Sequence, residues 1–190
     1  MLLLVGLGNP GSSYTNTRHN IGFKIIDAIN VHFKLSKQKP KFKGLLTTGN
    51  IEEEKIYAIK PLTFMNNSGT AIKELIDYFK IDAKDVFVFH DDLDIDFGKI
   101  KAKFGGSSAG HNGIESIDKF IGKDYSRIRI GIGHPKQKKK VSSHVLEDFK
   151  EDEEEKINEI SENIVKQLPT LIKKKIDLFS SKVNQDLHGI

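Results

Sequence analysis

MLLLVGLGNPGSSYTNTRH, residues 1–19, is the stretch that decides how this chain folds. Residues 2–5 are uniformly apolar, which predicts a short buried strand. Glycines at positions 6, 8 and 11 then predict a tight turn, and a polar segment follows that ends at His19. The glycine turn is typical of nucleotide binding, whereas the polar segment that ends at His19 is typical of hydrolytic chemistry. The function depends on which of these two interpretations is right.

The glycines fit the dinucleotide-binding pattern G-x-G-x-x-G after a strand. Three observations disfavour that use. Pro10 and the polar residues 12–17 keep a helix from starting in the turn, so no helix N-terminus faces a pyrophosphate. Asp27, near the position of a ribose-binding acid, lies inside a predicted helix, and no second strand follows within about thirty residues. We expect the glycines to turn the chain at a cleft edge and present Asn9, and keep a nicotinamide-dependent oxidoreductase as an alternative.

The composition is that of an ordinary globular protein with one domain. The chain has 190 residues, 37% hydrophobic and 29% charged, with a net charge of +4. Lysine supplies nearly all of the positive charge, because Arg18, Arg127 and Arg129 are the only arginines. Such a surface attracts a phosphate backbone, although it is equally typical of a solubilising lysine coat. The sequence has no cysteine, which excludes disulfides, a thiolate nucleophile and Cys-ligated metals.

The apolar segments predict a cytoplasmic protein. The apolar start has no basic segment before it and is too short for a signal peptide. No apolar run approaches the roughly 20 residues that span a bilayer, so we expect no membrane segment. No exposed apolar stripe is obvious, which favours a monomer.

Hydrophobic spacing predicts alternating strands and helices along the chain. The predicted strands are residues 2–5, 45–51, 55–60, 86–89, 99–104 and 127–132, of which 45–51 and 55–60 form a hairpin. Helices are predicted after a cap at Asn20, over residues 71–79, after His111, and from the acidic run 147–155 onward, with Pro169 separating the last helix. Lysine-rich residues 34–43, residues 61–67, the glycine–serine segment 105–110 and the basic residues 136–140 are predicted connections. The fold class is therefore α/β, a single-domain three-layer sandwich over residues 1–190, with helices on both faces of a mixed twisted β-sheet.

A histidine and a carboxylate lie at turning points of this fold. His19 ends a polar loop just before a helix, and Asp91 ends the apolar strand 86–89. Ligands of α/β sheets bind beyond the carboxyl ends of strands, where a carboxylate can orient a histidine. Taken alone, His19 is better explained as a surface histidine, and Asp91 is also consistent with a solvated loop acid. Asp92, Asp94 and Asp96 hint at a calcium loop, but the glycine and the bidentate glutamate are missing from their positions, so we predict no metal.

Amide side chains complete the candidate site. Asn66 follows Phe64 and Met65 in one loop, and Asn112 follows His111 in another. Asparagine offers neutral donors and acceptors that can fix an ester or amide carbonyl. Asn67 and Ser68 are alternatively explained by one helix N-cap. Together, one histidine, one carboxylate and several amides favour a water nucleophile with a general base attacking an activated ester, with no cofactor.

The chain resembles bacterial peptidyl-tRNA hydrolase over nearly its whole length. The resemblance is carried by residues 5–11 (VGLGNPG), Tyr14, residues 17–22 (TRHNIG), 60–69 (KPLTFMNNSG), 90–94 (HDDLD), 105–113 (GGSSAGHNG) and 127–135 (RIRIGIGHP). Several such motifs in this order and spacing are highly specific. Ala109 stands where many members have glycine, and the terminal helices match by composition only.

The resemblance implies a function and a set of site residues. It implies that His19 is the general base that activates water, that Asp91 holds and polarises it, and that Asn9 reads the acylated amino group. By the same resemblance the peptide and 3′-terminal adenosine site is lined by Tyr14, Phe64, Asn66 and Asn112, with Met65 and His111 beside it. Lys103 and Arg129 are similar to the family's contacts to the tRNA 5′ phosphate. Residues 105–110 and the C-terminal helices, from about residue 150 to 190, are then a mobile rim.

Two further function classes stay open beside hydrolysis of peptidyl-tRNA. One is an RNA-binding protein that keeps the cleft without the chemistry, which salt-dependent tRNA binding without turnover would indicate. The other is the nicotinamide-dependent oxidoreductase, which NAD-induced stabilisation would indicate.

Overall fold

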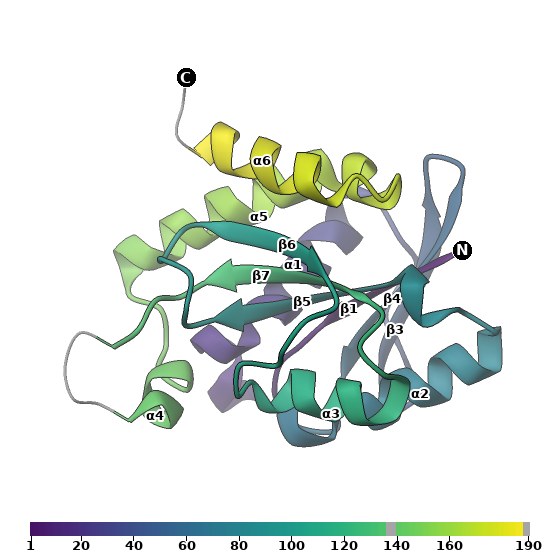
Figure 1. The fold of residues 1–190 in the computed structure, drawn as a ribbon, viewed down its shortest axis with the longest axis horizontal. Coiled ribbons are helices and arrows are strands. Elements are labelled where there is room, and N and C mark those ends of the chain that lie inside the picture. Colours follow the sequence, from purple (N-terminus) through teal and green to yellow (C-terminus); the bar gives the residue numbers. More distant parts are fainter. Residues whose placement is uncertain (136–139, 188–190) are drawn as a thin grey trace.

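The computed structural model describes residues 1–135 and 140–187, in which one mixed sheet lies between two layers of helices (Figure 1). This confirms the predicted α/β sandwich. The basic connection predicted at residues 136–140 lies, except for Lys140, outside the described residues.

The sheet has seven strands in the order β2-β3-β4-β1-β5-β7-β6. Its strands are β1 Leu2–Gly6, β2 Lys39–Lys41, β3 Gly44–Ile51, β4 Glu54–Pro61, β5 Val86–Asp92, β6 Ile100–Phe104 and β7 Ser126–Gly131. The middle strands β4, β1, β5 and β7 are parallel, and the pairs at both edges are antiparallel. The carboxyl ends of the parallel strands therefore share one edge of the sheet, where open α/β sheets bind ligands.

Side chains of the central strand β1 alternate between two hydrophobic cores. Leu2 and Leu4 belong to the core under α1, α5 and α6, and Leu3 and Val5 to the core under α2 and α3. The helices are α1 Ile21–His32, α2 Ser68–Phe79, α3 Asn112–Ile121, α4 Val141–Val145, α5 Glu151–Ile172 and α6 Ile176–Leu187. Each fully buried aliphatic side chain contributes about 1.5–3 kcal/mol, so helices on both faces fix the sheet and leave its edge to the loops.

Short 3-10 turns carry the chain across that edge. They are η1 Ser12–Tyr14, η2 Arg18–Asn20 and η3 Met65–Asn67, whereas a fourth turn, η4 Ala83–Asp85, lies at the opposite end of β5. The first helix α1 starts at Ile21, well beyond the glycine turn, as the argument against a dinucleotide site requires.

Two glycines let the start of α1 reach the sheet. A Cβ on Gly6 would lie 2.2 Å from the Gly22 carbonyl oxygen, and one on Gly22 would lie 2.4 Å from the Phe89 carbonyl oxygen. Any side chain at either position would therefore push α1 away from β1 and β5. This close approach brings His19, which immediately precedes α1, to the carboxyl end of β5.

The sequence prediction is wrong at Pro169 and in the lysine-rich connection, and it did not include α4. Pro169 does not separate two helices, because α5 continues through it to Ile172. Leu168, Leu171 and Ile172 are buried, and their packing compensates for the one hydrogen bond that proline cannot donate. The lysine-rich connection also contains the short edge strand β2, in which Pro40 is tolerated because an edge strand needs fewer ladder hydrogen bonds.

Within the described part of the chain, none of the helices combines the length and the apolar character needed to cross a bilayer.

Candidate active site

His19 and Asp91 meet at the carboxyl edge of the sheet. His19 Nδ1 lies 2.9 Å from both Asp91 Oδ1 and Oδ2, and both residues are buried. The two residues are 72 positions apart in sequence. Since a carboxylate only accepts, Nδ1 donates its proton to Asp91 and Nε2 is left with a lone pair. No hydrogen bond reaches Nε2 from the described residues, and this atom is not sealed from solvent.

His111 is a second imidazole on the same carboxylate. Its Nε2 lies 2.9 Å from Asp91 Oδ1, and its ring centroid lies 4.9 Å from that of His19. Its Nδ1 accepts from the backbone N–H groups of Gly113 and Ile114 at the start of α3. These two donors require an unprotonated Nδ1, so His111 keeps its proton on Nε2 and donates it to Asp91.

The charges of this cluster shift the pKa values of its members. Burial opposes the charged form of His19, but the Asp91 carboxylate and its hydrogen bond raise the pKa of His19 above its ordinary 6.5. Burial likewise opposes ionisation of Asp91, yet His19 and His111 hold the pKa of Asp91 well below its usual range. Asp91 is therefore an anion that stabilises protonated His19.

Asn9 is held in one orientation beside the pair. Asn20 accepts from the Asn9 backbone N–H and donates to the Asn9 carbonyl oxygen, both at 2.9 Å. The Met65 backbone N–H donates to Asn9 Oδ1 at 2.8 Å. The Asn9 amide NH₂ is consequently left as a donor.

These bonds also correct the expected helix caps. Asn20 occupies the position before α1, but its amide binds Asn9 and does not cap the helix. Asn67 likewise precedes α2 without a side-chain cap, and the Ser68 hydroxyl donates to the Met65 carbonyl oxygen.

The remaining predicted contact residues lie in the loops after β1 and β4 and at the start of α3. Tyr14 and Phe64 are in edge-to-face contact, with ring centroids 6.4 Å apart. Asn66 lies in η3, which packs against α3, whose first residue is Asn112. Both amides are exposed, and within residues 1–135 and 140–187 neither side chain makes a hydrogen bond. They are free to bind a substrate.

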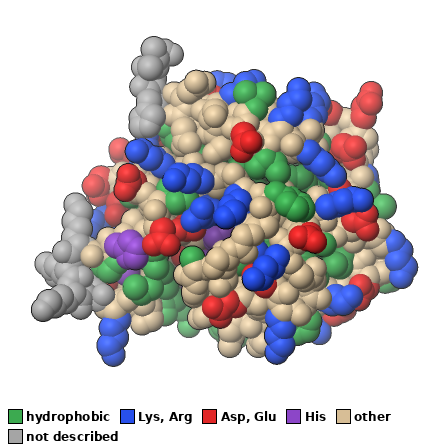
Figure 2. Space-filling model, in the orientation of Figure 1, with side chains coloured by type: hydrophobic (Ala, Val, Ile, Leu, Met, Phe, Trp, Pro, Cys, Tyr) green, Lys and Arg blue, Asp and Glu red, His purple; other side chains and the backbone are tan. Residues whose placement is uncertain are grey.

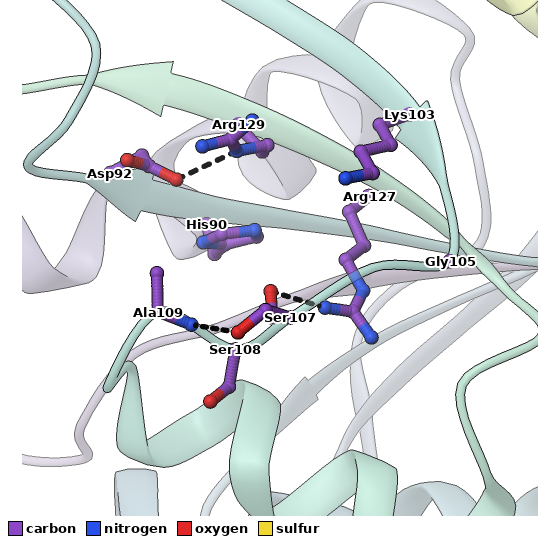
Figure 3. Close-up of a pocket in the computed structure, with 9 residues that line it drawn as sticks. All are labelled: His90, Asp92, Lys103, Gly105, Ser107, Ser108, Ala109, Arg127 and Arg129. Atoms are coloured by element: carbon purple, nitrogen blue, oxygen red, sulfur yellow. Dashed lines mark hydrogen bonds and ion pairs between the residues drawn. The ribbon is translucent and has the colours of Figure 1, made fainter.

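Lys103 and Arg129 lie apart from the His19–Asp91 pair, in a neighbouring basic pocket. This pocket of about 110 Å³ is lined by His90, Asp92, Lys103, Gly105, Ser107, Ser108, Ala109, Arg127 and Arg129 (Figure 3). Arg129 Nε donates to Asp92 Oδ2 at 2.8 Å, one residue beyond Asp91. Figure 2 shows Lys and Arg side chains gathered on this face, over β6 and β7.

Two buried members of this pocket, His90 and Arg127, have no role predicted from the sequence. His90 donates from Nδ1 to the Asp91 carbonyl oxygen, and its ring is edge-to-face with His111. Burial lowers the pKa of His90 to about 3, so it is neutral at pH 7. Arg127 donates to Asp118 at 2.7 Å and to the Ser107 carbonyl oxygen at 2.8 Å. Its i, i+2 spacing to Arg129 on one strand was the available signal.

The residues that could hold a metal ion are His19, Asp91 and His111, whose ligand atoms lie within 4.8 Å of one another. A metal on His111 Nε2 would displace its proton to Nδ1, which would then face two backbone N–H donors. The cluster therefore suits shared protons better than a shared cation. Two of the acids considered for calcium already have protein partners: Asp92 pairs with Arg129, and Asp94 accepts a hydrogen bond from His134.

The fold and the site together define a class: an α/β protein with a buried histidine–carboxylate pair at the carboxyl edge of its parallel strands, beside a basic pocket. A family model described as peptidyl-tRNA hydrolase matches residues 3–188. The chain is 72% identical over 184 residues to a peptidyl-tRNA hydrolase of Pelagibacter ubique, covering 97% of this chain and 99% of the relative. It is 47% identical to one from Ehrlichia ruminantium, covering 95% of this chain and 93% of that relative.

A solved structure agrees with these relatives. The crystal structure of peptidyl-tRNA hydrolase from Acinetobacter baumannii superposes with a TM-score of 0.90 at 35% identity, covering 97% of this chain and 94% of that one. The chain belongs to the peptidyl-tRNA hydrolase family.

Proposed function

We propose that this protein hydrolyses the ester bond between the peptide and the 3′-terminal ribose of peptidyl-tRNA, with His19 as general base. Family membership supports the reaction and the substrate class. The single observation that carries the mechanism is the His19–Asp91 contact of 2.9 Å, which leaves His19 Nε2 free to take a proton. The products are free tRNA and the released peptide or N-blocked amino acid.

The reaction balances with one water molecule and no other reactant. His19 Nε2 removes a proton as the water oxygen attacks the ester carbonyl carbon, and the bond from that carbon to the ribose oxygen then breaks. The proton on His19 passes to the ribose oxygen as it leaves. Asp91 orients the ring and stabilises the transient imidazolium, as the raised pKa of His19 indicates.

Substitution of His19 is the direct test of this mechanism. We expect His19→Ala to lower kcat for N-blocked aminoacyl-tRNA by roughly 10²–10⁴-fold, since the general base is lost. His32→Ala, at the exposed far end of α1, is the matched control and should stay within about twofold. Undiminished turnover by His19→Ala would remove His19 as the base. Salt-dependent tRNA binding by the wild type without any turnover would support the RNA-binding alternative.

Asn9 is proposed to separate peptidyl-tRNA from aminoacyl-tRNA. Because the Met65 N–H occupies its Oδ1, Asn9 presents a donor, which suits the carbonyl oxygen on an acylated amino group and repels a free ammonium. Asn9→Asp keeps the acceptor for Met65 and replaces the donor with an anion. We expect the ratio of turnover for blocked over unblocked aminoacyl-tRNA to fall at least about 10-fold. An unchanged ratio would contradict this role.

The other site residues are proposed as contacts to the RNA and the peptide. Tyr14, Phe64, Asn66 and Asn112, with Met65 and His111 beside them, would hold the peptide and the 3′-terminal adenosine. Lys103 and Arg129 would hold the 5′ phosphate of the acceptor stem, a contact independent of tRNA sequence. We further propose that the protein is cytoplasmic, which the absence of cysteine from the sequence supports. We propose that it is a monomer, which the lack of an obvious exposed apolar stripe in the sequence supports.

A further inference from the structure

Arg18 precedes His19 and is buried, although arginine normally extends into solvent. Its Nη1 donates to the carbonyl oxygens of Glu147 and Asp148, at 3.2 and 2.9 Å. Its Nη2 lies 2.6 Å from Glu153 Oε2, and its guanidinium carbon lies 5.5 Å from the centre of the Phe149 ring. Three successive residues between α4 and α5, together with the first turn of α5, thus surround this one side chain.

The backbone strengthens the same connection. The Arg18 N–H donates to the Glu147 carbonyl oxygen at 3.0 Å, and the Phe149 N–H donates to the Asn16 carbonyl oxygen at 3.1 Å. Thr17 and Asp148 form an antiparallel bridge between these bonds. The polar loop before α1 and the α4–α5 connection therefore pair like two short strands.

Glu153 extends the connection into α5. Its Oε2 also accepts from the Lys150 backbone N–H at 2.8 Å, which caps the start of that helix. The α4 helix also packs on η2, and His144 of α4 donates from Nε2 to the Gly133 carbonyl oxygen. The Arg18 guanidinium thus joins η2, which contains His19, to the α4–α5 connection and the start of α5.

Asn20, on the other side of His19, is tied to the Asn9 backbone by two hydrogen bonds. His19 therefore sits between two anchored neighbours, while its own ring binds Asp91. Sub-ångström placement of a general base governs its rate, and displacement by about 1 Å can cost about 100-fold. Of these two neighbours, Arg18 is the one whose side chain reaches the α4–α5 connection.

We propose that Arg18 is a positioning residue, which fixes the His19 turn to the α4–α5 connection so that the imidazole keeps its bond to Asp91. Arg18 itself touches no reacting atom. This inference rests on the proposed function of His19, but it concerns the geometry of the His19–Asp91 pair and can be measured without turnover. The planar guanidinium is needed because it bonds two carbonyl oxygens and a carboxylate at once, which an ammonium cannot reproduce in that geometry.

The test uses three variants, Arg18→Gln, Arg18→Lys and Glu153→Gln. The titration midpoint of the His19 ring is measured by NMR, and kcat and KM are measured with N-blocked aminoacyl-tRNA. The groups that face His19 in the described structure are Asp91 and His111, and none of the variants alters them. Glu154→Gln is the matched control, since Glu154 is in the same turn of α5 and pairs with Lys24 at the surface. We expect Arg18→Gln to lower kcat about 10- to 100-fold with KM nearly unchanged, and the His19 titration midpoint to fall toward 6.5. Glu153→Gln should lower kcat and the His19 midpoint by smaller amounts than Arg18→Gln. Arg18→Lys should retain more kcat than Arg18→Gln but less than the wild type.

The outcomes separate this inference from the proposed function. A folded Arg18→Gln whose His19 midpoint and kcat match those of Glu154→Gln would overturn the positioning role. If Arg18→Gln does not fold, Glu153→Gln decides by the same two readouts. A wild type without turnover would refute the proposed function, yet the shift of the His19 midpoint would still test Arg18.

Discussion

Asp91 holds two imidazoles that differ in what they can do. His111 has both ring nitrogens occupied, one by Asp91 and one by the N-terminal N–H groups of α3. His19 has only Nδ1 occupied by the described residues. The tautomers are fixed by these partners, so only His19 can accept a proton from water while Asp91 remains ionised. His111 contributes by adding a second donor to Asp91, which helps to keep that carboxylate an anion.

Phe64 is strained at its backbone. Its φ of 60° and ψ of 159° lie in a region that is almost confined to glycine and costs a bulky residue about 1–3 kcal/mol. Its neighbours enforce this conformation, because Met65 N–H must reach Asn9 and Asn67 N–H bonds the Phe64 carbonyl oxygen. This strained conformation accompanies an exposed Phe64 ring in edge-to-face contact with Tyr14.

This strain predicts a difference between two substitutions of Phe64. Phe64→Gly removes the ring and the strain, whereas Phe64→Ala removes only the ring. We expect the glycine variant to be more stable than the alanine variant by about 1 kcal/mol in chemical denaturation, after its extra unfolded-state entropy is subtracted. Both should lose activity, since both lack the aromatic wall. A glycine variant less stable than the alanine variant would mean that the backbone is not strained.

At the level of elements, α6 protects an otherwise open edge of the sheet. Strand β6 is an edge strand, and its outward N–H groups at Ile100 and Ala102 donate to Asn184 and Ser180 of α6. Asn184 also donates to the Ile100 carbonyl oxygen at 2.9 Å. Side chains of a helix thus replace the missing neighbour strand, which removes a site for pairing with another chain.

Asn184→Ala tests this protection. We expect it to lower the free energy of unfolding by about 1–2 kcal/mol, because the Ile100 N–H loses its partner and the Ile100 carbonyl oxygen keeps only the longer bond from Ser180. Gln185→Ala, at the exposed neighbouring position on α6, should be close to neutral. Equal denaturation midpoints for the two variants would show that the edge bonds contribute nothing. The kcat of the folded Asn184→Ala protein should not change, since Asn184 binds the edge strand β6 and takes no part in the His19–Asp91 hydrogen bond.

The elements also show where sequence patterns fail. Apolar periodicity predicted β5 and α2 correctly, because the spacing of their apolar residues depends only on burial. It does not depend on which elements they pack against. The prediction at Pro169 was wrong, since burial of Leu168 and Leu171 outweighs the tendency of one proline to end a helix. Short strand β2 was missed because its residues are exposed and only pairing with β3 makes them a strand.

For the whole molecule, the parallel middle of the sheet explains why residues far apart in sequence could be assigned to one site. Asn9 follows β1, Asn66 follows β4 and Asp91 ends β5, so strand direction alone places them at one edge. Sequence could not predict that His111 shares Asp91, nor that Arg18 is enclosed by the α4–α5 connection. Those contacts depend on how loops fold over the edge, and no periodicity encodes them.

The central claim is that Asp91 makes His19 a base of raised pKa, and the pH dependence of kcat/KM for N-blocked aminoacyl-tRNA tests it most directly. Protonated His19 cannot take a proton from water, so the rate should fall as the pH drops through the pKa of His19, with a midpoint above 6.5 in the wild type. In Asp91→Asn the charge that stabilises the imidazolium is gone, so the midpoint should move to lower pH and the plateau rate should fall by about 10²-fold or more. Asp94→Asn, which alters an exposed acid paired with His134, should leave both unchanged. A wild-type midpoint at or below 6.5, or an Asp91→Asn profile identical to the wild type, would contradict the account.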